Sequence, residues 1–237
     1  VAAIASRDLA KAQAVAKDFG IDRAYGSYET LLADPAIDAV YIPLPNHLHV
    51  PFAALALEAG KHVLCEKPIA LSANQAEELV RVASDHPRLK VMEAFMYRHH
   101  SQWQWASRMV REGRIGEVQM VHTCFHFCDD NPAGILHHQE WGGGCLMDIG
   151  CYPVSLSRWL FQAEPIHVSA IFEDDPQRGV DRAVAGVMRF PKGMASFTCS
   201  TQLPSLQRVS VFGTRGRVEL ELPFNPPNDL AHRALLE

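Results

Sequence analysis

Residues 39–68 read AVYIPLPNHLHVPFAALALEAGKHVLCEKP, and the fold follows from this stretch. An apolar run typical of a strand is followed by a helical segment that Gly60 closes, and then by a second apolar run. In the second run, Val63, Leu64 and Cys65 show no alternation of apolar and polar residues, which is the pattern of a strand covered on both faces. Strand, helix and strand in this order predict a parallel sheet.

The second apolar run ends in the triplet Glu66-Lys67-Pro68. In parallel sheets, ligands bind beyond the carboxyl ends of the strands, so charges at this position predict a binding site. Pro68 restricts Lys67 to extended geometry and permits a cis peptide bond. Glu66 is either a structural ion-pair partner or a residue on the cofactor side, and we favour the second interpretation. The alternative for Lys67 is an ordinary surface lysine at the start of a helix.

The same alternation of strands and helices extends over residues 1–97. Repeated units of this kind predict a Rossmann-like α/β domain, with a parallel sheet and helices on both faces. Between the first two helices we expect only a turn. The residues that we expect to begin or end helices in this domain are Asp8, Gly20, Ser27 and Ser72.

Residues 98–237 follow a different pattern, in which apolar runs are separated by short turns. The turns PKG at 191–193 and GTRG at 213–216 are typical of β-hairpins. Helices are predicted near residues 101–113 and 147–161. We therefore predict an α+β domain with a predominantly antiparallel open sheet, which serves substrate binding and oligomerisation.

The composition excludes several classes of protein. The net charge of −5 is spread along the chain, so we expect no nucleic-acid partner. No apolar run reaches the roughly 18 residues that span a bilayer, and no signal peptide is recognisable, so we expect no membrane partner. The six cysteines lack C-x-x-C spacing, which favours free thiols in a reducing compartment, and hence the cytoplasm.

Four motifs, GKHVLCEKP, MEAFMYR, GGGCLMDIGCYPV and VFGTRG, occur in this order along the chain. Together they resemble the glucose-fructose oxidoreductase, inositol dehydrogenase and MocA (Gfo/Idh/MocA) family. Within it, they are most similar to the group of dihydrodiol dehydrogenases and NADP-dependent D-xylose dehydrogenases. The resemblance covers nearly the whole chain and implies an enzyme that transfers hydride between a nicotinamide and a CH–OH group of a sugar, polyol or cyclic diol.

The resemblance also implies the catalytic residues Lys67, Tyr152 and Asp148. Hydride transfer to or from an alcohol needs a group that moves the hydroxyl proton. A phenol is a poor base at neutral pH, but a lysine ammonium beside it favours the phenolate. Asp148 lies four residues before Tyr152, on the same face of a helix, and is expected to contact substrate as Tyr152 does. The alternative is a turn and a helix cap with both side chains exposed.

Ser6 and Arg7 follow the first strand, at the position where dinucleotide folds select their cofactor. An acidic residue there binds the ribose hydroxyls of NAD, whereas an arginine accommodates the additional phosphate of NADP. We therefore expect NADP, with NAD less favoured. The alternative is an exposed arginine without a ligand.

By resemblance, Pro45, Asn46 and His49 are also cofactor-binding residues, in the loop after the strand that begins at residue 39. Leu44 replaces the hydroxyl residue that is usual in the family, and an asparagine in a loop is otherwise only a turn former. Arg98, in the motif MEAFMYR, matches a family arginine that either contacts substrate or holds the junction of the two domains.

A rival interpretation is a zinc protein, because alternating histidines and cysteines share one face of a predicted strand. Buried cysteines and histidines on a sheet face used for dimer contact explain the same pattern, so we predict no metal. An exposed sheet face favours a homodimer or homotetramer. The residues of this pattern are His122, Cys124, His126 and Cys128, with His137 and His138 downstream.

A dinucleotide site of this type normally begins with a G-x-G-x-x-G turn, and the 237 residues contain none. We therefore expect the first strand-helix unit, and the last part of the second domain, to lie outside this stretch of sequence. The alternative is a non-catalytic nucleotide- or sugar-binding regulatory protein that keeps the fold without its phosphate loop.

Overall fold

The computed structural model describes residues 1–129, 131, 133–227 and 233–237. The chain forms two compact units, Val1–Ala94 (unit 1) and Phe95–Glu237 (unit 2), which are described separately. The division falls close to residue 97, where the sequence places a domain boundary.

Unit 1 alternates strands and helices as predicted, and its strands pair only in parallel. β1 pairs with β2, and β3, β4 and β5 form a second sheet in that order. The strands are β1 (Ala3–Ala5), β2 (Arg23–Tyr25), β3 (Ala39–Ile42), β4 (His62–Cys65) and β5 (Val91–Glu93); the helices are α1 (Leu9–Phe19), α2 (Tyr28–Leu32), α3 (His49–Glu58) and α4 (Ala73–Asp85), with a 3₁₀ turn η1 (Asn46–Leu48).

The helix ends of unit 1 lie where the sequence predicted them. The Asp8 carboxylate accepts hydrogen bonds from two backbone N–H groups at the start of α1, and Gly20 ends this helix in the left-handed conformation. Ser27 and Ser72 cap α2 and α4 in the same way. The prediction of a mere turn after α1 was wrong, because residues 23–25 form β2 and pair with β1. Three residues are too few to produce a recognisable strand pattern.

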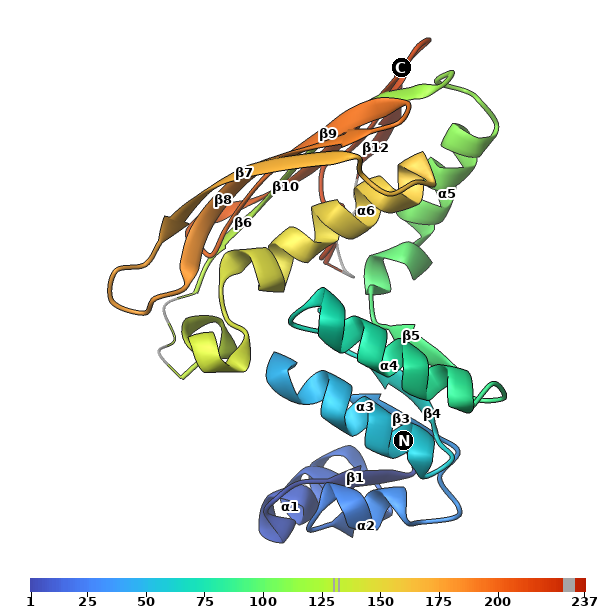
Figure 1. The fold of residues 1–237 in the computed structure, drawn as a ribbon, viewed down its shortest axis with the longest axis vertical. Helices are drawn as coiled ribbons and strands as arrows, with labels where there is room; N and C mark the ends of the chain where they lie inside the picture. Colours follow the sequence, from blue (N-terminus) through green and yellow to red (C-terminus); the bar gives the residue numbers. More distant parts are fainter. Residues whose placement is uncertain (130, 132, 228–232) are drawn as a thin grey trace. The chain divides into compact units, whose positions relative to one another are not determined.

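The prediction that β4 is covered on both faces was also wrong. Val63 and Cys65 are buried on the side of α3 and α4, which lie on one face of this sheet (Figure 1). Leu64 points the other way and is 38% exposed, and its register partners Tyr41 and Met92 are exposed as well. A run of three apolar residues does not reveal whether one or both faces of a strand are buried.

Unit 2 is a seven-stranded sheet with the order β12-β11-β10-β6-β9-β8-β7. Its pairs are antiparallel except β6 and β9, which run parallel. The strands are β6 (Val118–Cys128), β7 (His167–Asp174), β8 (Asp181–Phe190), β9 (Gly193–Ser200), β10 (Gln202–Gly213), β11 (Arg217–Leu220) and β12 (Ala234–Leu236).

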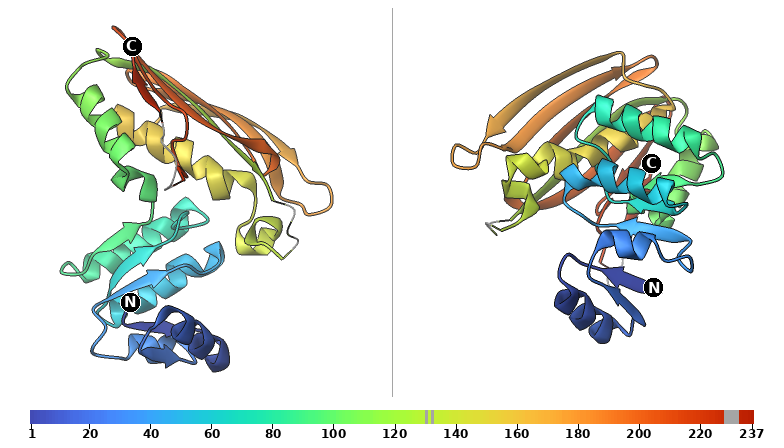
Figure 2. Two further views of the ribbon diagram at one scale, coloured as in Figure 1. Left: turned by 180° about the vertical axis from the view of Figure 1, so that it is seen from behind. Right: turned by 60° about the horizontal axis from the view of Figure 1, so that its bottom comes forward.

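Helices α5 (Ser101–Arg111) and α6 (Cys151–Phe161) lie along one face of this sheet (Figures 1 and 2). Between sheet and helices lies the core of the unit, with Trp103 and Phe125 fully buried. The indole N–H of Trp103 donates to the Pro223 carbonyl over 2.6 Å, so the polar atom of this buried ring has a partner. Short turns complete the unit: η2 (Met96–His99), η3 (Ile135–His137), η4 (Gln139–Trp141) and a π-helical turn η5 (Leu146–Gly150).

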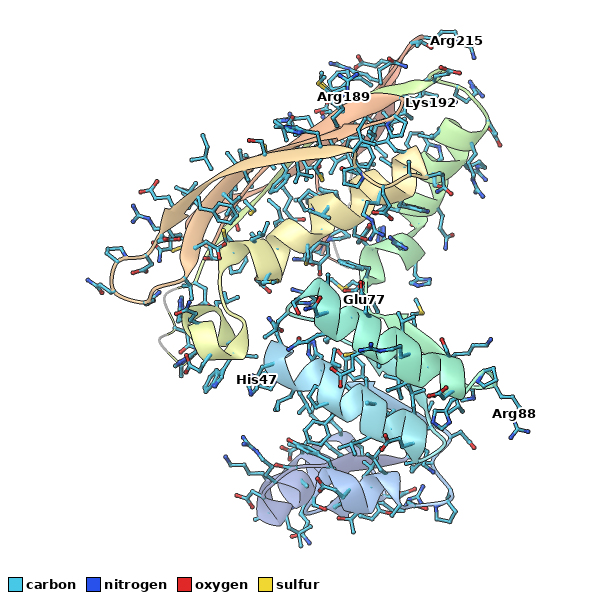
Figure 3. The ribbon with its side chains drawn as sticks, in the orientation of Figure 1. His47, Glu77, Arg88, Arg189, Lys192 and Arg215 are labelled. Carbon is cyan, nitrogen blue, oxygen red and sulfur yellow. The ribbon has the colours of Figure 1, made fainter. Side chains whose placement is uncertain are left out.

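The two predicted hairpins are present. β8 and β9 are joined at residues 191–192, and β10 and β11 at residues 214–216; Lys192 and Arg215 mark these turns in Figure 3. Among the described residues, no helix is long and apolar enough to cross a bilayer.

Candidate functional site

The residues predicted to bind or react fall into two groups, one in each unit. The group in unit 1 follows the carboxyl ends of three parallel strands, β1, β3 and β4, as expected for a ligand site in this fold. The group in unit 2 comprises Arg98 in η2, Asp148 in η5 and Tyr152 in α6. The members of the first group are Ser6, Arg7, Pro45, Asn46, His49, Glu66 and Lys67.

Side chains from neighbouring elements hold the backbone around Lys67. The Lys67–Pro68 peptide bond is cis. The backbone N–H of Lys67 donates to Glu66 Oε2 over 3.2 Å, and that of Ile69 donates to Glu93 Oε1 over 2.8 Å. Glu93 ends β5 and lies inside the motif MEAFMYR, but it was not among the predicted site residues.

Glu66 has a second partner in unit 1. The Tyr41 hydroxyl donates to Glu66 Oε1 over 2.6 Å. The pKa of Tyr41 is raised to about 12, mainly by partial burial of the phenol and, second, by this hydrogen bond to a carboxylate. Both Glu66 oxygens therefore have partners within the unit, as a structural role of this residue requires. The role on the cofactor side remains a prediction.

His49 is fully buried at the start of α3. Its Nδ1 lies 2.7 Å from the Pro68 carbonyl oxygen, and its Nε2 lies 2.7 Å from the Leu44 carbonyl oxygen. Pro45 accepts a hydrogen bond from the Leu48 N–H and so begins the η1 turn. The histidine thus joins the loop after β3 to the turn after β4.

His47 lies two residues before His49, at the amino end of α3 (Figure 3). Its Nδ1 is buried and has no hydrogen-bond partner among the described residues. His47 was not among the predicted site residues, and no periodic pattern distinguishes it from the other loop residues.

Ser6 and Arg7 directly follow β1. The Ser6 hydroxyl accepts a hydrogen bond from the Asp8 N–H over 3.3 Å. The Arg7 side chain is exposed and forms no hydrogen bond or salt bridge with a described residue. A free guanidinium beside a hydroxyl, at the carboxyl end of a parallel strand, fits the phosphate of a nucleotide.

A polar cluster around Asp34 lies in the same unit and was not predicted. The Tyr25 hydroxyl donates to Asp34 Oδ2 over 2.7 Å, and Arg23 forms a salt bridge with the same oxygen. The bond from Tyr25, with a further one from the Ala36 N–H, lowers the pKa of Asp34. The cluster fixes β2 to the end of α2.

In unit 2, Asp181 of β8 holds the start of the segment that carries Asp148 and Tyr152. Its Oδ2 accepts a hydrogen bond from the Leu146 N–H over 2.7 Å, and the Cys145 thiol lies 3.2 Å from the same oxygen. Gly144 has a φ of 104°, and a Cβ atom there would lie 2.0 Å from Asp181 Oδ1. Glycine is therefore required where the loop passes the carboxylate.

Tyr152 is 5% exposed and belongs to an aromatic cluster in unit 2. The alternative in which Tyr152 is an exposed helix residue was therefore wrong. Asp148, one helical turn earlier, is half-buried. The rings nearest to Tyr152 are those of Phe224, Phe95, Phe125 and Tyr97, with centroids 5.1 to 5.8 Å away.

Arg98 joins η2 to α6 within unit 2. Its Nη2 donates to the Ser155 hydroxyl over 2.9 Å, and its guanidinium lies over the rings of Trp159 and Phe95. Tyr97 contacts the same hydroxyl at 3.2 Å. These contacts support a role in holding the start of unit 2, and substrate contact by Arg98 remains a prediction.

The histidines of β6 contact hydroxyl side chains of β9, and the Cys124 sulfur lies 3.7 Å from His122 Nε2. His122 Nδ1 lies 2.9 Å from the Ser196 hydroxyl, and His126 Nε2 lies 2.9 Å from the Thr198 hydroxyl. His137 contacts Arg178 at 2.8 Å. The part of the chain that the structure describes contains no group of three His, Cys, Asp or Glu side chains that could hold a metal ion.

Residues 1–95 match the oxidoreductase family with an NAD-binding Rossmann fold, and residues 103–219 match the GFO/IDH/MocA C-terminal domain. The chain belongs to the Gfo/Idh/MocA family. Both matches agree with the family resemblance of the four motifs. As a member of this family, the chain is an NAD(P)-dependent dehydrogenase or reductase acting on CH–OH groups.

Named relatives include enzymes of the group to which the motifs pointed. A D-xylose 1-dehydrogenase (NADP⁺) of Haloferax volcanii is 43% identical over 94% of this chain and 69% of its own length. A trans-1,2-dihydrobenzene-1,2-diol dehydrogenase of Mus musculus is 34% identical over 95% of this chain and 68% of its own length. The structure of a 3-ketoreductase of Actinomadura kijaniata, solved with NADP and TDP-benzene, matches with a TM-score of 0.89 and 32% identity. The match covers 100% of this chain and 73% of the ketoreductase chain.

Proposed function

We propose that this protein is an NADP-dependent oxidoreductase that moves hydride between the nicotinamide and a CH–OH group of a sugar, polyol or cyclic diol. The observation that carries the choice of cofactor is the exposed, unpaired Arg7 side chain after β1, next to the Ser6 hydroxyl. The relatives support it, because the xylose dehydrogenase is named for NADP⁺ and the ketoreductase was solved with NADP.

The nicotinamide, when bound, supplies or accepts the hydride. In the direction of oxidation, the Tyr152 phenolate oxygen takes the proton of the substrate hydroxyl as the carbon loses hydride. In the direction of reduction, the same phenol gives the proton to the carbonyl oxygen. The Lys67 ammonium favours the phenolate and orients the hydroxyl, and Asp148 positions the substrate.

On the cofactor side, we assign Ser6 and Arg7 to the additional phosphate of NADP. Pro45, Asn46 and Glu66 follow the carboxyl ends of β3 and β4, where this fold binds its nucleotide. Arg98 remains a candidate for substrate contact in unit 2.

Replacement of Lys67 by Met and of Tyr152 by Phe tests the catalytic assignment. Wild-type protein is screened against aldoses, polyols and dihydrodiols by the absorbance of the reduced nicotinamide. Each replacement should abolish turnover of the substrate found, while NADPH titration followed by nicotinamide fluorescence should show binding close to wild type. Turnover by both variants in the full-length protein would exclude these roles. A full-length wild-type protein with its phosphate loop that binds no NADPH would favour a non-catalytic member of the fold.

Replacement of Arg7 by Ala tests the cofactor assignment. The KM for NADPH should rise at least about tenfold, because a charge-assisted contact to phosphate is lost, while the KM for NADH should change little. An equal change in the KM values for NADPH and NADH would show that Arg7 does not bind the additional phosphate.

We further infer a homodimer or homotetramer that uses the face of the seven-stranded sheet opposite α5 and α6. Neighbouring strands expose apolar side chains there, and Met120 and Met194 are direct register partners. Sedimentation analysis of wild type and of a Met194→Lys variant tests this. A variant that sediments as a smaller species supports the interface, and a monomeric wild type excludes it. On this face the exposed apolar residues include Met120, Ile171, Val187, Met194, Leu206 and Leu235.

The thiols support a reducing compartment such as the cytoplasm. No cysteine forms a disulfide among the described residues, and the buried sulfur atoms of Cys145 and Cys199 lie 3.7 Å apart, too far for a disulfide bond. Thiol titration of protein freshly isolated under acid quench should find six free thiols.

A further inference from the structure

The turn at residues 67–69 is held by two side chains for which catalysis offers no direct role. His49 lies 2.7 Å from the Pro68 carbonyl oxygen through Nδ1, and Glu93 accepts the Ile69 N–H over 2.8 Å. The two side chains come from α3 and from the end of β5, on either side of β4 in the sequence. Both contacts are made to one peptide group, the one between Pro68 and Ile69.

His49 also contacts a second loop of unit 1. Its second ring nitrogen lies 2.7 Å from the Leu44 carbonyl oxygen, so one buried ring links the loop after β3 to the turn after β4. A neutral imidazole has one N–H and can donate to only one of the two carbonyls, whereas the protonated ring can donate to both. Both ring nitrogens of His49 therefore face backbone carbonyl oxygens, and the ring is fully buried.

We propose that His49 and Glu93 are positioning residues for the Lys67 ammonium, acting through the Pro68 carbonyl and the Ile69 N–H. This inference rests on the proposed function of Lys67. The peptide group that these side chains hold is separated from Lys67 only by Pro68, so a shift of the turn moves the whole Lys67 side chain. A displacement of about 1 Å in a catalytic group lowers a rate by about 10²-fold.

Two replacements of His49 separate positioning from general stability. Asparagine carries its amide nitrogen on Cγ, as Nδ1 is carried, and can still donate to Pro68. Glutamine carries its amide one atom further out and reaches toward Leu44 instead. His49→Asn should keep kcat within about threefold of wild type, and His49→Gln should lower kcat by about 10²-fold with little change in the KM for NADPH.

Glu93 offers a matching pair. Glu93→Gln keeps an oxygen that can accept the Ile69 N–H and should keep kcat near the wild-type value. Glu93→Leu has no acceptor and should lower kcat by at least about tenfold. Comparable kcat values for Gln and Leu at this position would overturn the role of Glu93.

Lys61 provides the control for stability. The buried Lys61 ammonium donates to the Asp34 carbonyl over 2.8 Å. Like the contact of His49, this bond joins a buried side chain to the backbone of unit 1. Lys61 precedes β4, however, whereas the turn at residues 67–69 follows it. Lys61→Met should lower the urea midpoint and leave kcat unchanged. If kcat in the His49 variants simply follows their urea midpoints, as judged against Lys61→Met, positioning is excluded.

A measurement without turnover keeps the test independent of the proposed function. Lysines are dimethylated with ¹³C-formaldehyde, and the Lys67 signal is assigned by its loss in Lys67→Arg. The ¹³C shift of this signal should change in His49→Gln and stay near wild type in His49→Asn. Identical shifts in all variants would overturn the inference. An active Lys67→Met variant would instead overturn the proposed function. The ¹³C shifts would then decide by themselves whether His49 positions the Lys67 side chain.

Discussion

The backbone N–H of Leu146 donates to the Asp181 carboxylate over 2.7 Å, and this bond joins the segment that carries Asp148 and Tyr152 to strand β8. The Cys145 thiol lies 3.2 Å from the same oxygen. The bond to Cys199, burial and the Asp181 carboxylate together raise the pKa of Cys145, so this thiol stays protonated and unreactive. The carboxylate acts as the cap of the η5 turn.

Replacement of Asp181 by Ala should lower the free energy of unfolding by about 1–3 kcal/mol, because the partly buried N–H of Leu146 loses its acceptor. Urea unfolding followed by tryptophan fluorescence measures the change. Asp181→Asn retains an amide oxygen and should lose less. Equal stability of Asp181→Ala and wild type would show that the cap contributes nothing.

Replacement of Gly144 by Ala should destabilise the protein more than the same change at Gly20. Both glycines have positive φ, at 104° and 64°, but a Cβ at Gly20 meets nothing within 4 Å, whereas at Gly144 it collides with the Asp181 carboxylate. The control should cost about 1–2 kcal/mol from backbone strain alone. Parallel urea titrations compare the two variants, and a cost at Gly144 no larger than at Gly20 contradicts the collision.

Replacement of Tyr25 by Phe should raise the pKa of Asp34, because the hydroxyl of Tyr25 is the main cause of its low value. A depressed pKa in the folded state contributes stability above the pKa of the unfolded chain, and this contribution is lost as the pH falls through the folded value. The stability difference between wild type and variant should therefore be largest above about pH 5 and shrink in acid. Urea titrations at several pH values test this.

Tyr28→Phe is the matched control for that prediction, because the Tyr28 ring packs against Phe52 and its hydroxyl has no hydrogen-bond partner among the described residues. A pH dependence that is the same for both variants would contradict the role of Asp34.

Replacement of Glu66 by Gln should lower the pKa of Tyr41 from about 12 toward the ordinary value of about 10, although burial retains part of the shift. The raised pKa stabilises the folded protein below about pH 10, and this contribution is lost as the pH rises from about 10 to about 12. Phenolate absorbance during alkaline titration, with Tyr41→Phe as the blank, gives the pKa directly. An unchanged value would show that burial alone sets it.

Local features of unit 1 could be predicted because each depends on residues close in sequence. Asp8, Ser27 and Ser72 cap helices through N–H groups two or three residues away, and Gly20 ends a helix within one turn. The short strand β2 was missed, since only its pairing with β1 identifies three residues as a strand. The exposed face at Leu64 was missed for a similar reason, because burial depends on what packs there.

In unit 2, the hairpin turns could be predicted, whereas the parallel pair of β6 and β9 could not. The chain between these two strands contains a helix and two further strands, and no turn signal states which of them will be neighbours.

For the site, the sequence by itself determined that Glu66 and Lys67 follow the end of a strand, that Arg7 follows the end of another, and that Tyr152 lies on a helix after a glycine-rich loop. Only the tertiary structure decided that His49 and Glu93 grip the turn after Lys67 and that Asp181 caps the turn before Tyr152. These contacts are hydrogen bonds between a side chain and a backbone group 19 to 35 residues apart. Such bonds form only once folding brings the strand ends together, and they leave no periodic pattern in the sequence.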